Sequence, residues 1–576
     1  MAFHRKKQRG KRFRILIIIL VIVAALAAAA AVFVVNRYAP SGEESDYESY
    51  YGLDEDGEMF IVVDTERSES NGFYIDGHAY VDYDTVHDAM NSRFYWDSEE
   101  QILRYALPDA LLEISPEEAF YTSDKTETET DYTICTVLDG TMYLAMDFVA
   151  EYTDISYNYY EDPDRLVVST EWGTIDYVKL KKSADVRQKG GVKSPILTTA
   201  SRGDLVRVLE EGENWTKVCT DDGFIGYVMN RTLGKTQSVV SESTFEEPEY
   251  THITYDEDLC IAWHQITNQD ANENIDTVLT GLRGVNVISP TWFYLDDDEG
   301  NIASLASYDY VDYCHSKDIE VWGLVSNLEN GDVDTEAVLT STSSRDNLVN
   351  QVIAAAIQYD LDGINIDFES LSSDVGDGFI EFIRELSLKC ANNGIVLSVD
   401  NYVPSEYTTL YQREEQANFA DYVILMAYDE HYSGSEEAGS VASIEFVEQG
   451  VADTLAEGVP ADQLILGIPF YTRVWAETPD ESAESGYVLS SEAVSMSEAE
   501  ELVDENEAET EWLEDCGQYY AEYVVDDVTY KIWLEEQNSI EEKLDVFEEN
   551  GLAGVSFWKL GFEKSTIWDT VVEYVE

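Results

Sequence analysis

The sequence is poor in basic residues. It has 35 Lys and Arg against 116 Asp and Glu, which gives a formal net charge of −81. Nucleic-acid binding needs stripes of Lys and Arg that neutralise phosphates, so we expect no nucleic-acid partner. The same charge favours solubility and repels anionic polymers at long range.

Cysteine and histidine are also scarce, with six and seven residues in 576. No two cysteines form a C-x-x-C pair, and no histidine lies at metal-ligand spacing from one. We therefore expect buried free thiols rather than a disulfide framework. The sequence predicts no metal site and no cofactor.

A long hydrophobic run occurs once, near the N-terminus. Residues 1–14 form a basic segment with seven Lys and Arg, and residues 15–35 are uninterruptedly apolar. A helix of that length spans roughly 30 Å, the thickness of one hydrocarbon core. The positive-inside rule places the N-terminus in the cytoplasm and the rest of the chain outside the cell. A cleaved signal peptide is the alternative, because A-x-A sites occur in 24–31. Since signal cores usually run 7–15 residues, we predict an uncleaved, single-pass membrane anchor.

The next segments predict a stalk and a repeat module. Residues 38–70 are rich in Ser, Gly, Asp, Glu and Tyr and predict a solvated stalk. Residues 71–177 contain an internal repeat, in which 73–90 aligns with 136–153. Each copy predicts a D-G hairpin turn, an alternating strand, a short helix and a second strand. The layout resembles the copper amine oxidase N-terminal-like domain of bacterial surface proteins, although nothing in it has copper-ligand spacing.

Residues 178–236 predict a small all-β domain. The pattern E-G-x-x-W-x-K-V-x-x-x-D-G-x-x-G-Y-V, which includes Trp215 and Tyr227, resembles a bacterial SH3-like domain. Such modules often attach to cell-wall polymers, but many are spacers. Trp215 is equally a core residue, so no site is assigned to it. An acidic linker, 237–250, follows.

Residues 250–576 alternate apolar strands with amphipathic helices. The predicted strands are 259–266, 284–293, 319–327, 361–369, 395–403, 422–431, 464–473 and 553–563. Eight such β/α units predict an α/β fold, a parallel (β/α)8 TIM barrel. Residues 474–552 are too long for one crossover and predict a small α+β insertion. Polar and aromatic residues gather at the carboxyl ends of the strands, where barrels of this kind hold their chemistry.

The fourth strand carries the candidate catalytic carboxylates. In D-G-I-N-I-D-F-E, three apolar residues alternate with Asn365, Asp367 and Glu369. Because side chains on a strand alternate with period two, the polar trio points into the barrel and successive members lie about 6.5–7 Å apart. Two carboxylates this close raise the pKa of one of them, which suits a general acid. Glu369, nearest the mouth, is the better candidate. A calcium loop needs a different spacing, and the strand has no Lys or Arg for a structural ion pair.

At this point the domain resembles glycoside hydrolase family 18. The signature D-G-x-D-x-D-x-E is matched by Asp362, Gly363, Asp367 and Glu369, and Asn365 replaces its middle Asp. The stretches V-N-V-I-S-P-T-W-F, L-S-V-D-N-Y-V-P, M-A-Y-D-E-H and Y-K-I-W-L-E resemble the branch that contains spore and cell-wall glucosaminidase-type enzymes.

The resemblance implies retaining hydrolysis of β-linked N-acetylglucosamine polymers, peptidoglycan before chitin, by substrate-assisted catalysis. By analogy, Glu369 protonates the leaving oxygen and later activates water. Asp367 orients and charge-stabilises the acetamido N–H of the substrate. Tyr428 donates a hydrogen bond to the acetamido oxygen.

The resemblance also suggests substrate-binding residues. Trp558 forms a hydrophobic floor under the sugar, Asp429 and Arg473 contact sugars, and Trp292 and Asn365 complete the set. Asn365 removes one negative charge behind Asp367, which should lower the pKa of that carboxyl.

Two other functions remain open at this stage. The first is a non-catalytic glycan-binding or scaffold protein of the cell surface that keeps the barrel. Degenerate family members often lose the acid, and the presence of Glu369 favours an enzyme instead. The second is an enzyme for another 2-acetamido glycan. The strong negative net charge of the chain argues against binding to an anionic wall, because like charges repel.

Overall fold

The computed structural model describes residues 2–123, 125–483 and 485–575, with side chains from residue 13 onward. The chain forms two compact units. One comprises residues 1–94, 114–121 and 128–247, and the other comprises 95–113, 122–127 and 248–576.

The chain begins with one long helix, α1 (Ala2–Tyr38). Its segment Phe13–Tyr38 has a mean hydropathy of 3.3 and is long and apolar enough to cross a membrane. Helix and composition fit a membrane anchor and a signal sequence equally.

The predicted stalk at 38–70 is wrong. Helix α2 (Tyr47–Tyr51) packs Tyr51 against Phe60, with ring centroids 3.8 Å apart. Residues 59–62 of β1 are fully buried, because this short apolar run, E-M-F-I-V-V, lies between two neighbouring strands. The many acidic residues of 38–70 dominate the average composition of the segment, so the short apolar strand β1 within it is not apparent.

That strand belongs to a seven-stranded sheet with the order β11-β12-β1-β2-β3-β10-β9. Its strands are β1 (Glu58–Val63), β2 (Glu66–Ile75), β3 (His78–Asp82), β9 (Cys135–Leu138), β10 (Thr141–Ala145), β11 (Ser156–Tyr160) and β12 (Arg165–Ser169). Each repeat copy makes a hairpin at its D-G pair, and Asp76 and Asp139 both have positive φ. Short helices follow, α3 (Tyr83–Ala89) and α4 (Met146–Glu151).

The second sheet of this unit is the SH3-like domain, with seven strands in the order β15-β14-β18-β17-β16-β13-β19. They are β13 (Gly173–Leu180), β14 (Ala184–Arg187), β15 (Ile196–Ala200), β16 (Leu205–Glu211), β17 (Trp215–Thr220), β18 (Ile225–Met229) and β19 (Leu233–Ser241). The domain is a few residues longer at each end than the predicted 178–236. Trp215 is half-buried and packs beside Gly190, where an added Cβ would lie 3.1 Å from the Trp215 Cβ and 3.2 Å from its Cγ.

The second unit contains the predicted (β/α)8 barrel. Its parallel strands are β20 (Leu259–His264), β21 (Val287–Leu295), β23 (Glu320–Ser326), β24 (Gly363–Asp367), β25 (Val396–Tyr402), β26 (Tyr422–Met426), β27 (Leu464–Pro469) and β33 (Gly554–Trp558). Strand β20 pairs with both β33 and β21, which closes the ring. A short strand, β22 (Ile302–Ser304), adds to β21 antiparallel. All eight predicted strands are confirmed.

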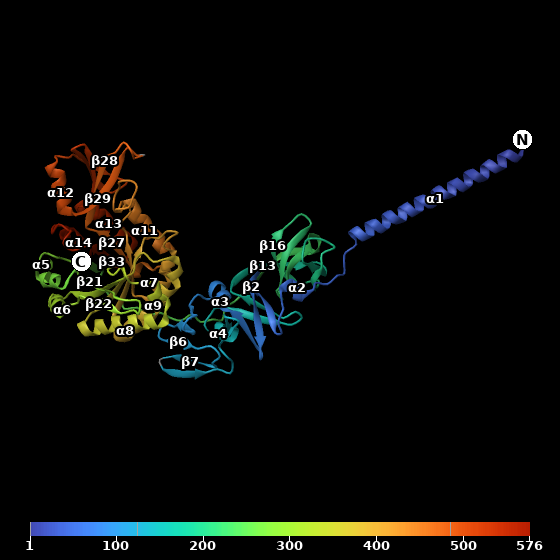
Figure 1. Cartoon of the computed structure of the whole chain (residues 1–576), viewed down its shortest axis with the longest axis horizontal. Coiled ribbons are helices and arrows are strands. Elements are labelled where there is room, and N and C mark those ends of the chain that lie inside the picture. The colour runs from blue at the N-terminus through green and yellow to red at the C-terminus, as the bar shows by residue number, and fades with distance from the viewer. Residues whose placement is uncertain (1, 124, 484, 576) are drawn as a thin grey trace. The chain divides into compact units, whose positions relative to one another are not determined.

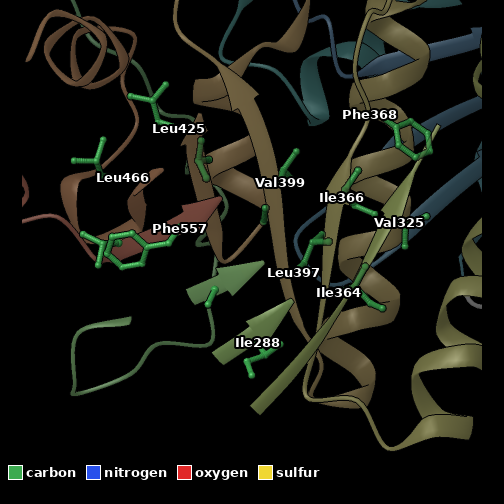
Figure 2. Close-up of a cluster of buried hydrophobic side chains, with 14 of the residues drawn as sticks. Ile288, Val325, Ile364, Ile366, Phe368, Leu397, Val399, Leu425, Leu466 and Phe557 are labelled. Carbon is green, nitrogen blue, oxygen red and sulfur yellow. The ribbon is translucent and has the colours of Figure 1, made fainter. Parts of the chain in front are cut away.

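Helices surround the ring (Figure 1). They are α5 (Ile275–Val278), α6 (Tyr308–His315), α7 (Thr335–Thr340), α8 (Thr342–Tyr359), α9 (Gly376–Asn393), α10 (Arg413–Phe419), α11 (Ile444–Ala456), α13 (Gln537–Asn550) and α14 (Ile567–Val575). The outward-facing side chains of the strands pack against them. Figure 2 shows Ile364 and Ile366 of β24, and Phe368 just after it, next to Leu397 and Val399 of β25.

The inward-facing side chains fill the barrel. Trp263, Trp322, Leu324 and Ile424 belong to one buried cluster there. Trp322 is thus a core residue. Gly363 admits it, because a Cβ at that position would lie 2.6 Å from the Trp322 ring. The alternation predicted for β24 therefore holds, with its apolar set toward the helices and its polar set inside.

The inserted lobe is shorter than the predicted 474–552. It is a five-stranded antiparallel sheet of β28 (Tyr471–Pro479), β29 (Tyr487–Ser495), β30 (Thr510–Leu513), β31 (Gln518–Val525) and β32 (Val528–Leu534), with α12 (Met496–Glu505). The lobe lies above the barrel in Figure 1. Helix α13, predicted inside the insertion, contacts β27 and β33 and belongs to the barrel.

The second strand predicted for the first repeat copy belongs to a hairpin of the barrel unit. Strands β4 (Phe94–Asp97), β5 (Ile102–Ala106) and β6 (Leu111–Ile114) continue into β7 (Phe120–Ser123) and β8 (Thr126–Glu129). On β5, the buried guanidinium of Arg104 pairs with Glu385 of α9 at 2.8 Å and with Asp346 of α8 at 2.9 Å. Arg345 pairs with the same Glu385. Residues 95–113 therefore belong to the barrel unit and not to the predicted domain 71–177.

All six cysteines are free thiols, and five are buried. This agrees with the prediction.

Candidate active site

The site is built on two neighbouring strands, β24 and β25, whose side chains meet inside the barrel. The register pairs Asn365 with Ser398, and Ile366 with Val399. Continued along the strands, it sets Asp367 beside Asp400 and Glu369 beside Tyr402. Acidic and phenolic groups are thereby stacked at the carboxyl end of the barrel.

Glu369 is half-buried at the end of β24. Its Oε2 accepts a hydrogen bond from the hydroxyl of Tyr402 at 2.5 Å. Asn327, which follows β23, fixes the backbone: its side chain accepts from the Glu369 N–H at 2.8 Å and donates to the Glu369 carbonyl at 3.0 Å. Burial raises the pKa of Glu369, Tyr402 lowers it, and the charges of Asp429 and Glu329 raise it further. A carboxyl group so held keeps its proton to higher pH than a free one.

Asp367 lies one step deeper. Its Oδ1 is buried and has no hydrogen-bond partner among the described residues. Burial raises the pKa of Asp367 well above its usual range, and the charges of Asp400, Glu369 and Glu329 add to this. The predicted lowering by Asn365, which compares it with an Asp at that position, stays a prediction. Asn365 does remove a charge from β24, but Asp400 brings one in from β25.

Asn365 itself is fully buried beneath these groups. Its Oδ1 accepts from Trp263 Nε1 at 2.9 Å and from Ser289 Oγ at 3.0 Å, and its Nδ2 donates to Asp400 Oδ1 at 2.8 Å. The predicted contact of Asn365 with substrate is wrong, because both polar atoms of its side chain already form hydrogen bonds inside the protein.

Tyr428 and Asp429 follow β26, on the other side of Asp400. The half-buried Tyr428 ring lies edge-on to Tyr471, with centroids 6.3 Å apart. Burial raises the pKa of Tyr428 well above its usual range, and the charges of Asp400, Asp367 and Glu369 contribute. These charges place the phenol near the carboxylate cluster. Asp429 is exposed and accepts from the Tyr471 hydroxyl at 2.6 Å.

Trp558 ends β33 and is half-buried, with its ring edge-on to Trp263 at 5.9 Å. Arg473 lies at the base of the lobe on β28, where Nη1 donates to Ser491 Oγ at 3.3 Å. Its charge lowers the pKa of Tyr471, against the larger raising effects of burial and Asp429. Through Tyr471, Arg473 is linked to Asp429.

Trp292 does not reach this site. It is fully buried, donates from Nε1 to Asn272 Oδ1 at 2.9 Å, and packs edge-on to Tyr310 of α6 at 4.9 Å. Ser289 of the same strand reaches Asn365 inside the barrel, so the side chain of Trp292 lies on the opposite, helix-facing side. The predicted sugar contact of Trp292 is therefore wrong.

Three site residues received no role from the sequence, namely Asn327, Asp400 and Tyr402. The alternation in V-L-S-V-D-N-Y carried the signal for two of them. Ser398, Asp400 and Tyr402 share one face of β25, just as the polar trio shares one face of β24. Asn327 acts through the backbone of Glu369, which no sequence pattern reveals.

A closed parallel barrel with a half-buried, raised-pKa glutamic acid beside a second carboxyl group is the arrangement of an acid–base hydrolase. Glu369 lies just past the carboxyl end of β24, where such barrels carry catalytic groups. Comparison with known proteins gives the particular class.

Residues 302–563 match the sequence model of Glycosyl hydrolases family 18, and residues 182–234 match that of the Bacterial SH3 domain. The barrel of this chain is a family 18 glycoside hydrolase domain. The SH3-like prediction is confirmed, while the resemblance of the repeat module to the copper amine oxidase N-terminal-like domain stays a prediction.

Similar curated proteins come from Bacillus subtilis (strain 168). The uncharacterized glycosylase YvbX is 25% identical over 50% of this chain and 84% of its own length. The putative sporulation-specific glycosylase YdhD is 28% identical over 41% and 56%, and the cortical fragment-lytic enzyme is 25% identical over 42% and 58%. The chain thus spans little more than half of the latter two.

Two solved structures share the fold. The C-terminal domain of a putative chitinase from Desulfitobacterium hafniense DCB-2 has a TM-score of 0.51 at 20% identity, covering 56% of this chain and 99% of that one. The Bacillus cereus spore cortex-lytic enzyme SleL has a TM-score of 0.50 at 18% identity, covering 59% and 78%.

Proposed function

We propose that the barrel hydrolyses β-linked N-acetylglucosamine polymers with retention, using the substrate's own 2-acetamido group as the nucleophile. One observation carries this: Glu369 follows Asp367 by two residues, just past the end of β24, and the two carboxyl groups are close enough for their charges to interact. Two carboxyl groups so placed reach a glycosidic bond from one side and cannot flank it, as a two-carboxylate mechanism requires.

In the first step, the proton of Glu369 goes to the leaving glycosidic oxygen as its bond to C1 breaks. The acetamido carbonyl oxygen forms a bond to C1 and gives an oxazolinium ion. Asp367 accepts from the acetamido N–H and offsets the positive charge. In the second step, the Glu369 carboxylate takes a proton from water, whose oxygen attacks C1 and reopens the ring with net retention.

The surroundings suit these roles. Burial holds a proton on Glu369 until cleavage, and the Tyr402 hydroxyl then stabilises the carboxylate that forms. The Tyr428 hydroxyl makes no hydrogen bond within the part of the chain described by the structure, so it is available to the acetamido oxygen. The half-buried ring of Trp558 offers the sugar an apolar surface.

Peptidoglycan is the proposed substrate, ahead of chitin and of other 2-acetamido glycans. The similar cortical fragment-lytic enzyme and the SH3-like domain support this choice. The apolar helix α1, preceded by a basic segment, supports a single-pass anchor with its N-terminus in the cytoplasm and the barrel outside the cell. A non-catalytic, glycan-binding role is the second candidate, and an intact Glu369 argues against it.

The test uses the full chain in detergent micelles, incubated with N-acetylglucosamine oligosaccharides and with purified peptidoglycan. We expect cleavage of both, with β products detected by proton NMR before mutarotation. Matched oligosaccharides that lack the 2-acetamido group should not be cleaved. Equal cleavage of these would point to a protein nucleophile. Binding without cleavage of any substrate would support the scaffold role.

A further inference from the structure

Asp400 is a buried carboxyl group that the mechanism above does not use. It lies on β25 and is 2% exposed; the register pairs Ile366 with Val399, and continued by one residue it sets Asp400 beside Asp367, whose pKa the charge of Asp400 raises. Side chains of neighbouring parallel strands at the same level face the same side of the sheet, about 5 Å apart. Two acidic groups are thus neighbours inside the barrel.

The orientation of the Asp400 carboxyl is set from below by Asn365. Because the Asn365 oxygen already accepts from Trp263 and Ser289, its amide nitrogen must face Asp400, and it donates to Asp400 Oδ1 at 2.8 Å. One oxygen of Asp400 is therefore occupied as an acceptor. Next to it, Oδ1 of Asp367 is buried with no donor.

No cation balances this pair. Among the described residues, no Lys, Arg or His forms an ion pair with Asp367, Asp400 or Glu369. The ionisable groups nearby are Glu369, Tyr402, Tyr411 and Tyr428 beside the pair, Glu329 after β23 and Asp429 after β26. All of them are neutral or negative. Two neighbouring carboxyl groups inside a barrel, without a cation between them, do not both ionise.

We propose that Asp400 is a positioning residue that holds one proton against the unpaired oxygen of Asp367, so that the pair carries a single negative charge. A protonated Asp400 supplies the donor that Asp367 Oδ1 lacks, and Asp367 keeps its other oxygen for the substrate. This inference rests on the proposed function for the role of Asp367, while the shared proton itself does not. The proposal also explains why β24 can have Asn365 where the family signature has an Asp: Asp400 on the neighbouring strand β25 supplies the second acidic group.

The direction of the pH effect follows from burial. Burial raises the pKa of both carboxyl groups above their unfolded values, and Asp400 raises that of Asp367 further. The folded state therefore binds protons that the unfolded state releases. The stability contributed by the protonated pair is complete at low pH and is lost as pH rises through the folded-state pKa values.

The test combines thermal unfolding and kinetics on the full chain in micelles. Asp400→Asn keeps a donor toward Asp367 at every pH and removes one titrating group. Its Tm should fall less steeply with rising pH than that of the wild type, and its kcat/KM should stay within about tenfold. Asp400→Leu, which has no donor, should lie at least about tenfold below Asp400→Asn in kcat/KM. The exposed Asp374→Asn should follow the wild type in both measurements.

A double variant rebuilds the pair on one strand. In Asn365→Asp with Asp400→Asn, the new carboxyl at 365 can still accept from Trp263 and Ser289, and a second acidic group again lies next to Asp367. The steep fall of Tm with pH should return. A slope unchanged in Asp400→Asn, or an Asp400→Asn variant as inactive as Asp400→Leu, would overturn the proposal. If the wild type cleaves no glycan, the proposed function fails, and the Tm slopes still decide the shared proton.

Discussion

The hydroxyl of Tyr402, the last residue of β25, donates to Oε2 of Glu369 at 2.5 Å. This bond joins the candidate acid to the strand that also carries Asp400. A hydrogen bond to a carboxylate favours its charged form. Tyr402 therefore lowers the pKa of Glu369 against the larger raising effect of burial.

Tyr402→Phe removes that donor without changing the shape of the ring. The pKa of Glu369 should rise, so the acid keeps its proton to higher pH. We expect the alkaline limb of the kcat/KM profile to move to higher pH, and kcat at the optimum to fall by roughly tenfold because the Glu369 carboxylate formed on cleavage loses a charge-assisted hydrogen bond. Tyr407→Phe is the control, because Tyr407 follows the same strand but its side chain is exposed. A profile that moves to lower pH contradicts this account.

Two tryptophans at strand ends should respond differently to truncation. Trp558→Ala removes a half-buried ring and should lower kcat/KM by about tenfold or more, mainly through KM, with little change in stability. Trp292→Ala empties a fully buried position and should cost about 3–5 kcal/mol of unfolding free energy. Urea unfolding and steady-state kinetics on both variants separate the effects. Equal losses of stability would contradict the difference in burial between the two rings.

The hairpin at 95–113 should be needed for barrel stability. Arg104→Met leaves Glu385 with one guanidinium partner, Arg345, and leaves Asp346 with none from β5. Breaking a buried pair costs about 3–5 kcal/mol, so we expect a loss of about 3 kcal/mol in urea unfolding. Arg283→Met is the matched control, because its pair with Asp569 is exposed and worth about 0–1 kcal/mol. Equal effects of the two variants would refute a supporting role for the hairpin.

Removing residues 2–38 tests the anchor. The truncated chain keeps Ser41 and Ser45, whose backbone N–H groups bond to the SH3-like domain. We expect the full chain to stay in the membrane fraction after carbonate extraction at its full mass, and the truncated chain to be soluble. A membrane-free protein that lacks the first residues would instead identify a cleaved signal sequence.

Much of the barrel could be predicted because its strands are buried on both faces and therefore appear as apolar runs at regular intervals. The carboxyl ends of those runs located Glu369, Asp367 and Tyr428. The same period-two reasoning, applied to every strand, would also have placed Asp400 inside the barrel and Trp292 outside it. Asp400 was missed and Trp292 was wrongly placed in the site because the position of a residue along its strand does not tell which face of the sheet its side chain is on.

Other features depend on contacts between distant segments. The strand at Glu58–Val63 was hidden by acidic neighbours, and its burial becomes visible only when β12 and β2 flank it. The hairpin around Arg104 follows the repeat pattern, yet its charged partners lie on α8 and α9, more than 200 residues away in sequence. Local patterns carry no information about such pairs.

The most direct test of the account is the activity of Glu369→Gln on a fluorogenic β-glycoside of an N-acetylglucosamine disaccharide. Glutamine keeps the shape and the backbone contacts with Asn327 but cannot donate the acidic proton. The predicted result is a fall in kcat of at least about a hundredfold with oligosaccharide binding retained, while the exposed Glu406→Gln keeps wild-type activity. A Glu369→Gln enzyme as active as the wild type would contradict the assignment of Glu369 as the acid.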